Sequence, residues 1–337
     1  MNATHTKTWP RSKLTTTALG FGAAQLGNFN REMSDSDAHA LIQEAWEAGL
    51  KFYDTAPSYG HGLSEARLGQ GLRWKPRGDF ILSTKVGRLL TPRARQHIDF
   101  NPWVNGLPFD WHFDYSYDGT MRSIEDSLQR TGLEYIDVAL IHEIDVATHG
   151  AHQREIFEGS MNGAAKALLR LRDQGVVKSI GVGVNECDVA VNAIQLADFD
   201  CILLAGRYTL LEQHALDELF PLCEMRDVSV IVGGGYNSGV LATGAVPGAM
   251  YNYAPADDTV LGRVRHIENI CKEFNVSLKS VALQFILKHP VVKTVIPGTR
   301  SISQLHENVN LLNSPIPAEL WSALKDDKLI RDDSPVL

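Results

Sequence analysis

The feature that most constrains the fold of this chain is a regular alternation of short apolar segments with longer segments of helical periodicity, from about residue 15 to residue 312. Eight short β-branched runs stand out, at residues 19–22, 51–54, 80–84, 136–141, 179–182, 201–204, 229–232 and 294–296. Such a pattern is typical of repeated βα units whose strands form a parallel sheet. Eight units favour a closed (β/α)8 TIM barrel, because an open doubly wound sheet usually has fewer repeats.

The length of 337 residues would by itself suggest two domains. Barrels of this kind, however, often hold about 250 residues or more in one domain, and no low-complexity linker interrupts the chain. We therefore predict a single (β/α)8 barrel domain over residues 1–337, with long loops after some strands and an additional amphipathic C-terminal helix near residues 316–330.

Charge and hydropathy narrow the possible partners. The formal net charge is -8, and Lys and Arg are spread along the chain without a basic run. Nucleic acid and anionic membranes are therefore not expected as partners, and a small-molecule substrate is the better default. No apolar stretch resembles a signal peptide or approaches the roughly 18 residues of a membrane span, so we expect a cytoplasmic protein. We expect a monomer or a small homo-oligomer.

The metal-ligating residue types show no spacing that predicts a metal site. The four cysteines lack CxxC spacing and are expected to be buried small hydrophobic residues: Cys187, Cys201, Cys223 and Cys271. No HxH or paired-carboxylate spacing appears at the predicted strand ends. A barrel with a cluster of carboxylates and histidines at its rim could be a metal-dependent lyase or hydrolase. The absence of such spacing disfavours this alternative.

Three predicted loops are too long to be plain connectors, at residues 86–118, 143–158 and 236–258. Each follows a predicted strand, which in a barrel places it at the C-terminal face, where active sites lie. The first loop is rich in aromatic residues between Phe100 and Tyr117. These can form a substrate wall or lid, or can simply pin the loop onto the barrel, and the sequence gives the two alternatives equal weight.

Four titratable side chains converge on this predicted face. Asp54, Lys85 and His142 lie at or just beyond strand ends, and Tyr59 follows in the next loop. A tyrosine can transfer protons near neutrality only if its phenolate is stabilised, which a lysine ammonium held by a carboxylate can do. A neutral histidine can hydrogen-bond the substrate oxygen. Singly, each has a structural alternative, such as a turn cap, an ordinary ion pair or a core histidine; their joint placement favours catalysis.

With these residues in view, the sequence resembles the aldo-keto reductase superfamily over nearly its whole length. The segment YDTAPSYGHGLSEARLGQGL at residues 53–72 carries the closest resemblance, followed in order by STKVG, LIHEID and IPGTRSISQLHENV. The resemblance implies a (β/α)8 barrel that binds NAD(H) or NADP(H), with Asp54, Tyr59, Lys85 and His142 as the catalytic tetrad. It also places Asp54 beside the cofactor.

The same resemblance implies a set of cofactor-binding positions. Gly22 and Ala23 are expected near the nicotinamide ribose, and the segment GYNSG, with Gly235, Ser238 and Gly239, near the pyrophosphate. Glycines there would allow close backbone approach, although ordinary turn chemistry is the simpler explanation for any one of them. The positions expected to bind the adenosine half are Gly298, Thr299, Arg300, Gln304, Glu307 and Asn308.

The chain departs from the common family pattern in three places. Gly183 and Val184 stand where many members carry a Ser-Asn pair that holds the nicotinamide carboxamide, so Asn185 is expected to substitute. Gly233 replaces the aromatic residue that often stacks on the nicotinamide. Gly298 and Gln304 align with the lysine and arginine of NADP-preferring members. Losing two cations favours NAD as the cofactor, while Arg300 keeps NADP possible.

Within the superfamily, the segments LGFGAAQLGN, DVALIHEIDVATHG and LLAGRYTLLEQ resemble bacterial sugar dehydrogenases of the D-threo-aldose, L-fucose and L-galactose type, and equally the pyridoxal 4-dehydrogenases. Both substrate groups form cyclic hemiacetals, so the implied reaction is NAD(P)-dependent oxidation of a hemiacetal carbon to a lactone. Glu143 is expected either to contact the substrate or to be a solvent-facing loop residue without a specific role. The alternative of another class is a non-enzymatic, nucleotide-binding barrel subunit, which the intact tetrad disfavours.

Overall fold

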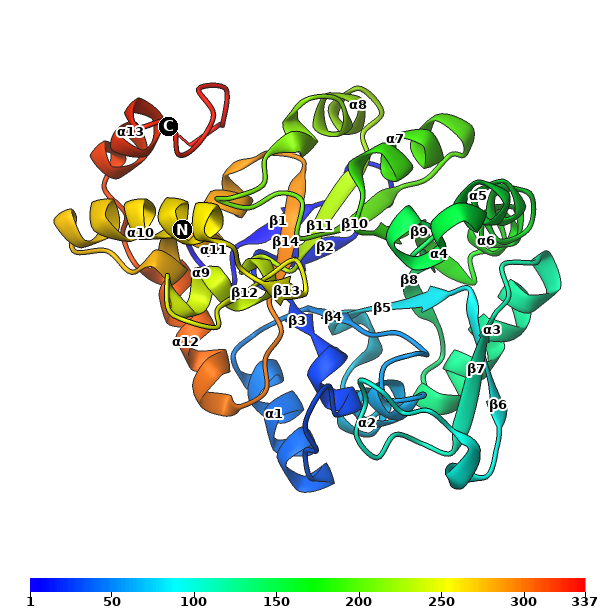
Figure 1. Ribbon diagram of the computed structural model, residues 1–337. Coiled ribbons are helices and arrows are strands. Elements are labelled where there is room, and N and C mark those ends of the chain that lie inside the picture. Colours follow the sequence, from blue (N-terminus) through cyan, green and yellow to red (C-terminus); the bar gives the residue numbers. More distant parts are fainter. Residues whose placement is uncertain (337) are drawn as a thin grey trace.

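The computed structural model describes residues 1–336 and contains a parallel eight-stranded sheet surrounded by helices (Figure 1). The strands of this sheet, in hydrogen-bonded order, are β3 (Phe21–Gly22), β4 (Phe52–Asp54), β5 (Ile81–Val86), β8 (Ile136–His142), β9 (Val177–Val184), β10 (Cys201–Ala205), β11 (Ser229–Gly233) and β14 (Val292–Ile296). The Gly20 amide donates to the Val295 carbonyl at 2.9 Å, and the Val295 amide donates to the Ala18 carbonyl at 2.9 Å. These bonds join the first strand to the last and close the barrel, so the predicted fold class is confirmed.

Helices connect the strands and pack around the barrel. The α-helices are α1 (Asp35–Glu47), α2 (Leu63–Leu72), α3 (Tyr117–Thr131), α4 (Val146–His149), α5 (Gln153–Asn162), α6 (Ala164–Asp173), α7 (Cys187–Leu196), α8 (Leu219–Met225), α9 (Val240–Thr243), α10 (Asp258–Glu273), α11 (Leu278–Lys288), α12 (Ile302–Asn313) and α13 (Ala318–Asp326). The 3-10 helices are η1 (Ala23–Gly27), η2 (Arg77–Asp79), η3 (Arg95–His97), η4 (Gly150–His152), η5 (His214–Leu216) and η6 (Asn237–Gly239). Several α-helices begin at a serine whose side chain accepts a hydrogen bond from an otherwise unpaired backbone amide of the first turn. These residues are Ser34, Ser116 and Ser301. Helix α13 is the predicted C-terminal helix.

A short N-terminal hairpin fills the lower end of the barrel. Strands β1 (Thr6–Thr8) and β2 (Thr15–Thr17) pair antiparallel, and the loop between them carries Trp9 and Leu14. Both side chains are buried in a cluster with Phe52, Val138 and residues of further strands, distinct from the larger core between barrel and helices. Trp9 and Leu14 thus fill one end of the barrel interior.

The three long loops contain regular structure of their own. The first forms the hairpin of β6 (Arg88–Pro92) and β7 (Phe109–Phe113), which lies beside α3 (Figure 1). The second contains α4 and the start of α5. The third contains η6, α9 and the hairpin of β12 (Met250–Tyr251) and β13 (Ala254–Pro255).

Three of the cysteines are buried as expected, and Cys187 is partly exposed; all four are free. Within residues 1–336, no helix combines the length and apolar character needed to cross a membrane. The same residues contain no group of three or more His, Cys, Asp or Glu side chains arranged to hold a metal ion.

Candidate active site

A buried ion pair joins the ends of two neighbouring strands at the C-terminal face of the barrel. Lys85, on β5, places its Nζ 2.9 and 2.8 Å from the two carboxylate oxygens of Asp54, on β4. The ammonium also donates to the Thr55 carbonyl at 2.8 Å, and the Ser83 hydroxyl donates to Asp54 at 2.8 Å. Both charged side chains are almost fully buried. These additional hydrogen bonds offset the cost of burying the two charges and fix the geometry of the pair.

Tyr59 lies directly above this pair. Its ring centroid is 5.2 Å from the Lys85 Nζ and 5.4 Å from the ring centroid of Trp103, which comes from the aromatic loop. Burial raises the pKa of Tyr59 well above that of a free tyrosine, and the negative charges of Asp54 and Glu143 raise it further. The Arg88 guanidinium acts in the opposite direction without offsetting this rise. Tyr59 is therefore a phenol, a proton donor, at neutral pH. The expected stabilisation of the phenolate by Lys85 stays a prediction.

His142 ends β8, and its ring centroid lies 6.1 Å from that of Tyr59. Burial lowers its pKa well below that of a free histidine, and the positive charges of Arg88 and Lys85 lower it further. The imidazole is therefore neutral. The Tyr115 hydroxyl donates to the His142 carbonyl at 2.8 Å and so anchors the backbone that carries the ring.

Tyr59 and His142 open into a cavity of about 200 Å³ at the barrel rim, whereas Asp54 and Lys85 do not line it. Its lining residues are Ser58, Tyr59, Arg88, Asn101, Pro102, Trp103, Trp111, His142 and Glu143. The cavity contains two indole rings, a phenol and an imidazole, together with one ion pair between Arg88 and Glu143 at 2.5 Å. It suits a small, polar, ring-shaped molecule. The aromatic loop therefore forms a wall of the cavity, in agreement with one of its two sequence interpretations.

Arg88 is the residue of this cavity that the sequence analysis missed. It contacts His142, which is 54 residues further along the chain. The available signal was its position three residues after Lys85, at the start of the long loop and thus at the same rim. Glu143 has a left-handed backbone conformation (φ 47°), which is uncommon for a residue other than glycine and indicates a locally constrained turn.

Two of the positions expected to bind the cofactor meet in a second, small cavity of about 20 Å³. Asn185 and Ser238 both line it, together with Arg207, which the sequence analysis did not single out. The backbone and side-chain amides of Asn185 donate to Asp145 at 2.9 and 3.2 Å, which fixes the side chain. The Tyr253 amide donates to the Ser238 hydroxyl at 2.9 Å, so the β12–β13 loop reaches over this cavity. The cavity has room for about one water molecule.

The positions expected to bind adenosine separate into two groups. Arg300 and Gln304 line a cavity of about 510 Å³ between the N-terminal ends of α1 and α12, with Arg31 opposite. Thr299 and Asn308 are buried and bond to each other at 3.3 Å. Glu307 lies apart from the cavity and pairs with Lys279 at 2.6 Å. The structure therefore brings Arg300 and Gln304 together, whereas Glu307 does not line their cavity and is engaged with Lys279 of α11.

The remaining predicted positions are small residues around the first, seventh and eighth strands. A Cβ atom on Gly22 would lie 3.0 Å from the Ile296 carbonyl oxygen, and one on Gly235 would lie 2.7 Å from Ile286. Gly239 has φ 114°, which only glycine adopts without strain. Ala23 is buried at the start of η1, and Gly298 bridges to Gly22 across the closure of the barrel. Close packing is thus sufficient to explain Gly22 and Gly235, and backbone conformation is sufficient to explain Gly239.

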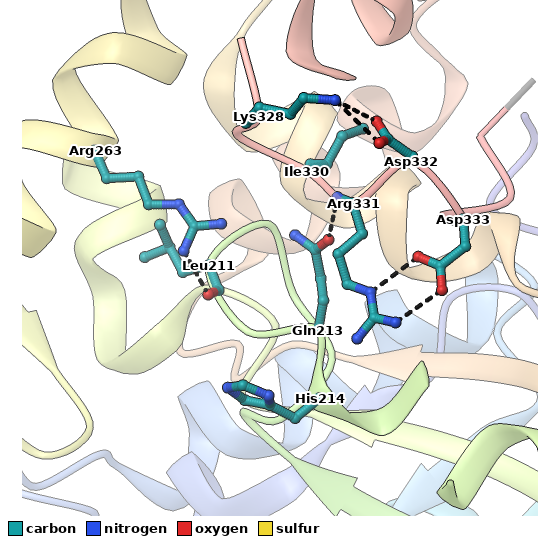
Figure 2. A pocket seen from close by; sticks show the side chains of 9 residues that line it. All are labelled: Leu211, Gln213, His214, Arg263, Lys328, Ile330, Arg331, Asp332 and Asp333. Carbon is teal, nitrogen blue, oxygen red and sulfur yellow. Dashed lines mark hydrogen bonds and ion pairs between the residues drawn. The ribbon is translucent and has the colours of Figure 1, made fainter. Parts of the chain in front are cut away.

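A cavity of about 520 Å³ near the C-terminal tail contains no tetrad residue. Figure 2 shows that its charged side chains face one another: Lys328 pairs with Asp332 at 3.0 Å, and Arg331 with Asp333 at 2.8 Å. Arg263 donates to the Leu211 carbonyl at 3.0 Å. Because these groups already have partners, the cavity is a junction that fastens the tail to the barrel.

Comparisons with known proteins agree with this geometry. The model of the family described as "Aldo/keto reductase family" matches residues 18–327. A pyridoxal 4-dehydrogenase from Microbacterium luteolum is 40% identical over 98% of this chain and 99% of its own length. A D-threo-aldose 1-dehydrogenase from a Pseudomonas species is 38% identical over 93% of this chain and 94% of its own.

A solved structure supports the same assignment. The holo form of an aldo-keto reductase from Bacillus halodurans superimposes with a TM-score of 0.72 at 27% identity, covering 97% of both chains. The family model spans nearly the whole barrel, and two relatives exceed 30% identity over almost the full length. The chain belongs to the aldo/keto reductase family.

Proposed function

We propose that this protein is a nicotinamide-dependent dehydrogenase that oxidises the hemiacetal carbon of a small cyclic substrate to a lactone. The observation that carries the proposal is that Tyr59 and His142 line one rim cavity of about 200 Å³, with the Asp54–Lys85 pair next to the Tyr59 ring. At this cavity one side chain can transfer a proton and another can position the substrate oxygen at the same reacting carbon.

Tyr59 is the proton-transfer residue in this proposal. In the oxidative direction the phenolate takes the proton of the anomeric hydroxyl while the carbon loses hydride; in the reductive direction the phenol returns the proton. The Lys85 ammonium, which Asp54 holds in place, lies 5.2 Å from the centroid of the Tyr59 ring and would stabilise the negative charge of the phenolate. Because the pKa of Tyr59 is raised, the oxidative direction needs alkaline pH to supply the phenolate.

His142 holds the reacting oxygen by a hydrogen bond from its neutral ring, which fixes the distance between the reacting groups. Trp103 and Trp111 supply flat apolar surfaces on which a sugar or pyridine ring can pack. Glu143, about one-third exposed, can accept hydrogen bonds from substrate hydroxyl groups at the mouth of the cavity.

A bound NAD or NADP would supply the hydride acceptor. Ser238 and Arg207 carry donors of the kind that bind a pyrophosphate. Binding there requires the β12–β13 loop to move, because the cavity that they line holds only about one water molecule. Arg300 and Arg31 line a wider cavity that suits the adenosine half. Asn185 can hold a carboxamide. We propose NAD as the preferred cofactor, because Gly298 and Gln304 supply no cation for a 2′-phosphate.

Two substrate groups satisfy this chemistry. The pyridoxal and aldose dehydrogenases to which the chain is 40% and 38% identical act on substrates that can close to cyclic hemiacetals. Loss of hydride and a proton from such a carbon gives a lactone in both cases. We propose an aldose of the L-fucose, L-galactose or D-arabinose type first, with pyridoxal as the second candidate.

The test is initial-rate formation of reduced nicotinamide with NAD and with NADP, over L-fucose, L-galactose, D-arabinose, D-glucose and pyridoxal at mildly alkaline pH. Turnover of an L-sugar or D-arabinose with formation of the lactone supports the proposal as stated. Turnover of pyridoxal alone moves the substrate to the second candidate with the same chemistry. Nucleotide binding without turnover of any of them contradicts the enzymatic proposal and favours a non-enzymatic nucleotide-binding barrel.

A further inference from the structure

Arg88 is the one charged side chain that contacts both His142 and Glu143 in the rim cavity within the described chain. It is the first residue of β6 and is 7% exposed. Its Nη1 lies 3.0 Å from the His142 Nδ1, and its Nη2 donates to the Glu143 carboxylate at 2.5 Å. The guanidinium is therefore engaged on two sides before any substrate enters.

Two aromatic rings of the β6–β7 hairpin hold the same guanidinium. Its central carbon lies 5.1 Å from the ring centroid of Trp111 and 4.9 Å from that of Phe113. Such contacts stabilise an arginine in one orientation. Arg88 is thus a fixed part of the wall, and its hydrogen bond to His142 has a defined direction.

The chemistry of the two side chains determines which ring nitrogen carries the proton. A guanidinium has five N–H donors and no acceptor, so the His142 Nδ1 must accept the hydrogen bond. In a neutral imidazole the other nitrogen, Nε2, then carries the hydrogen. Nε2 is the ring nitrogen left to face a substrate oxygen.

We propose that Arg88 is a positioning residue that holds His142 in the Nε2-protonated tautomer, so that this N–H is directed at the reacting oxygen of the substrate. The proposal rests on the function proposed above for its catalytic consequence, whereas the tautomer itself is a property of the protein alone. The β6–β7 hairpin thereby acts on the chemistry through Arg88 as well as forming a wall of the cavity.

The surroundings of His142 are consistent with a neutral ring. Arg88 and Lys85 face it as cations, Glu143 Oε1 lies 3.9 Å from its Nε2, and the Tyr59 ring stands edge-on. Burial and the two cations lower the pKa of His142, with burial the larger cause. Replacing Arg88 therefore removes a hydrogen bond that selects the tautomer and a charge that opposes protonation.

The experiment uses nitrogen-15 NMR of the full-length protein labelled at histidine, in which long-range correlations distinguish Nδ1–H, Nε2–H and doubly protonated rings. The signals of His142 are assigned by their loss in His142→Gln. We expect an Nε2–H ring in the unmodified protein. Arg88→Met, which keeps length and apolar packing but has no donor, should give a mixture of tautomers and a ring that protonates at higher pH.

Kinetics provide the second readout. Arg88→Met should lower kcat about 10- to 100-fold, part of the roughly 10²- to 10⁴-fold that a positioned acid or base contributes, with little change in the KM for the nucleotide. Arg88→Lys, which can donate to only one partner at a time, should recover part of kcat. The matched control is Arg93→Met, because Arg93 pairs with Asp110 on the exposed part of the same hairpin. It should leave kcat, melting temperature and the His142 signals unchanged.

An Nδ1–H ring in the unmodified protein would overturn the proposal, as would an unchanged tautomer and kcat in Arg88→Met. Equal loss in Arg93→Met would also overturn it, since the effect would then belong to hairpin stability. If the unmodified protein turns over no substrate, the proposed function fails, and the NMR result still decides whether Arg88 sets the tautomer.

Discussion

The backbones of Gly27 and Gly60 interlock at the active-site rim. A Cβ atom on Gly60 would lie 2.5 Å from the Gly27 carbonyl oxygen, and one on Gly27 would lie 2.6 Å from the carbonyl carbon of Tyr59. Gly60 also has φ 65°, a conformation that favours glycine. The end of η1 and the loop that carries Tyr59 therefore pack backbone against backbone, more closely than residues with a Cβ atom would allow.

The substitution Gly27→Ala should consequently displace Tyr59. We expect kcat to fall about 100-fold, because misplacement of a reacting group by about 1 Å can cost that much, and the free energy of unfolding to fall by about 1 to 3 kcal/mol through overpacking. Steady-state kinetics and thermal melting measure the two effects. Gly78→Ala is the control, because a Cβ atom there would meet nothing within 4 Å. Full activity in the Gly27→Ala variant would show that Tyr59 does not depend on this contact.

Replacing Tyr59 by Phe should abolish turnover while nucleotide binding persists. The substitution removes only the hydroxyl, so the packing of the ring on Trp103 is kept and the proton-transfer group is lost. We expect kcat to fall by about 10²- to 10⁴-fold. Initial rates and a fluorescence titration with reduced nicotinamide measure turnover and binding. Tyr117→Phe, at the start of α3 and outside the cavity, should behave like the unmodified protein; comparable turnover in the two variants would refute the role of Tyr59.

The oxidative rate should rise with pH. The pKa of Tyr59 lies above its usual value, so the phenolate that accepts the substrate proton is scarce at neutral pH and increases as pH approaches that pKa. We expect kcat for oxidation to increase about tenfold per pH unit, as for a single ionising group, and kcat for reduction to stay level until the phenol ionises. Rates in both directions between neutral and alkaline pH test this. An oxidative rate independent of pH would contradict it.

The substitution Lys85→Met should move this rise to still higher pH. Without the ammonium, Asp54 would face Tyr59 uncompensated and the phenolate would be harder to form. Both kcat and the position of its pH profile are measured. Lys178→Met is the matched control, because Lys178 pairs with the buried Asp137 at the opposite end of the barrel. If both variants keep the original profile, Lys85 does not act on the tyrosine.

The eight barrel strands could be predicted because buried parallel strands leave β-branched runs in the sequence. The β1–β2 hairpin could not, since its strands have three residues each and depend on Trp9 entering the barrel. The placement of Asp54, Lys85 and His142 near strand ends on one face could be predicted, and their catalytic role stays a prediction. The contact of Arg88 with His142 could not be predicted, because it forms only when separate segments fold together. Burial is the main cause that raises the pKa of Tyr59, and the sequence does not reveal how deeply this ring is buried. The stabilisation of its phenolate by Lys85 stays a prediction.

The substitution Gln304→Arg should improve the use of NADP over NAD. Gln304 and Arg300 line the same cavity, and the Gln304 side-chain oxygen accepts the Arg300 amide at 2.9 Å. A new guanidinium there would meet the 2′-phosphate of NADP, and a charge-assisted hydrogen bond of about 1.5 to 3 kcal/mol corresponds to at least a roughly tenfold gain in kcat/KM. NAD lacks that phosphate, so its kcat/KM should change little. The control, Gln195→Arg, makes the same substitution on the exposed part of α7; an equal gain there would mean that added positive charge, and not this cavity, attracts the dinucleotide.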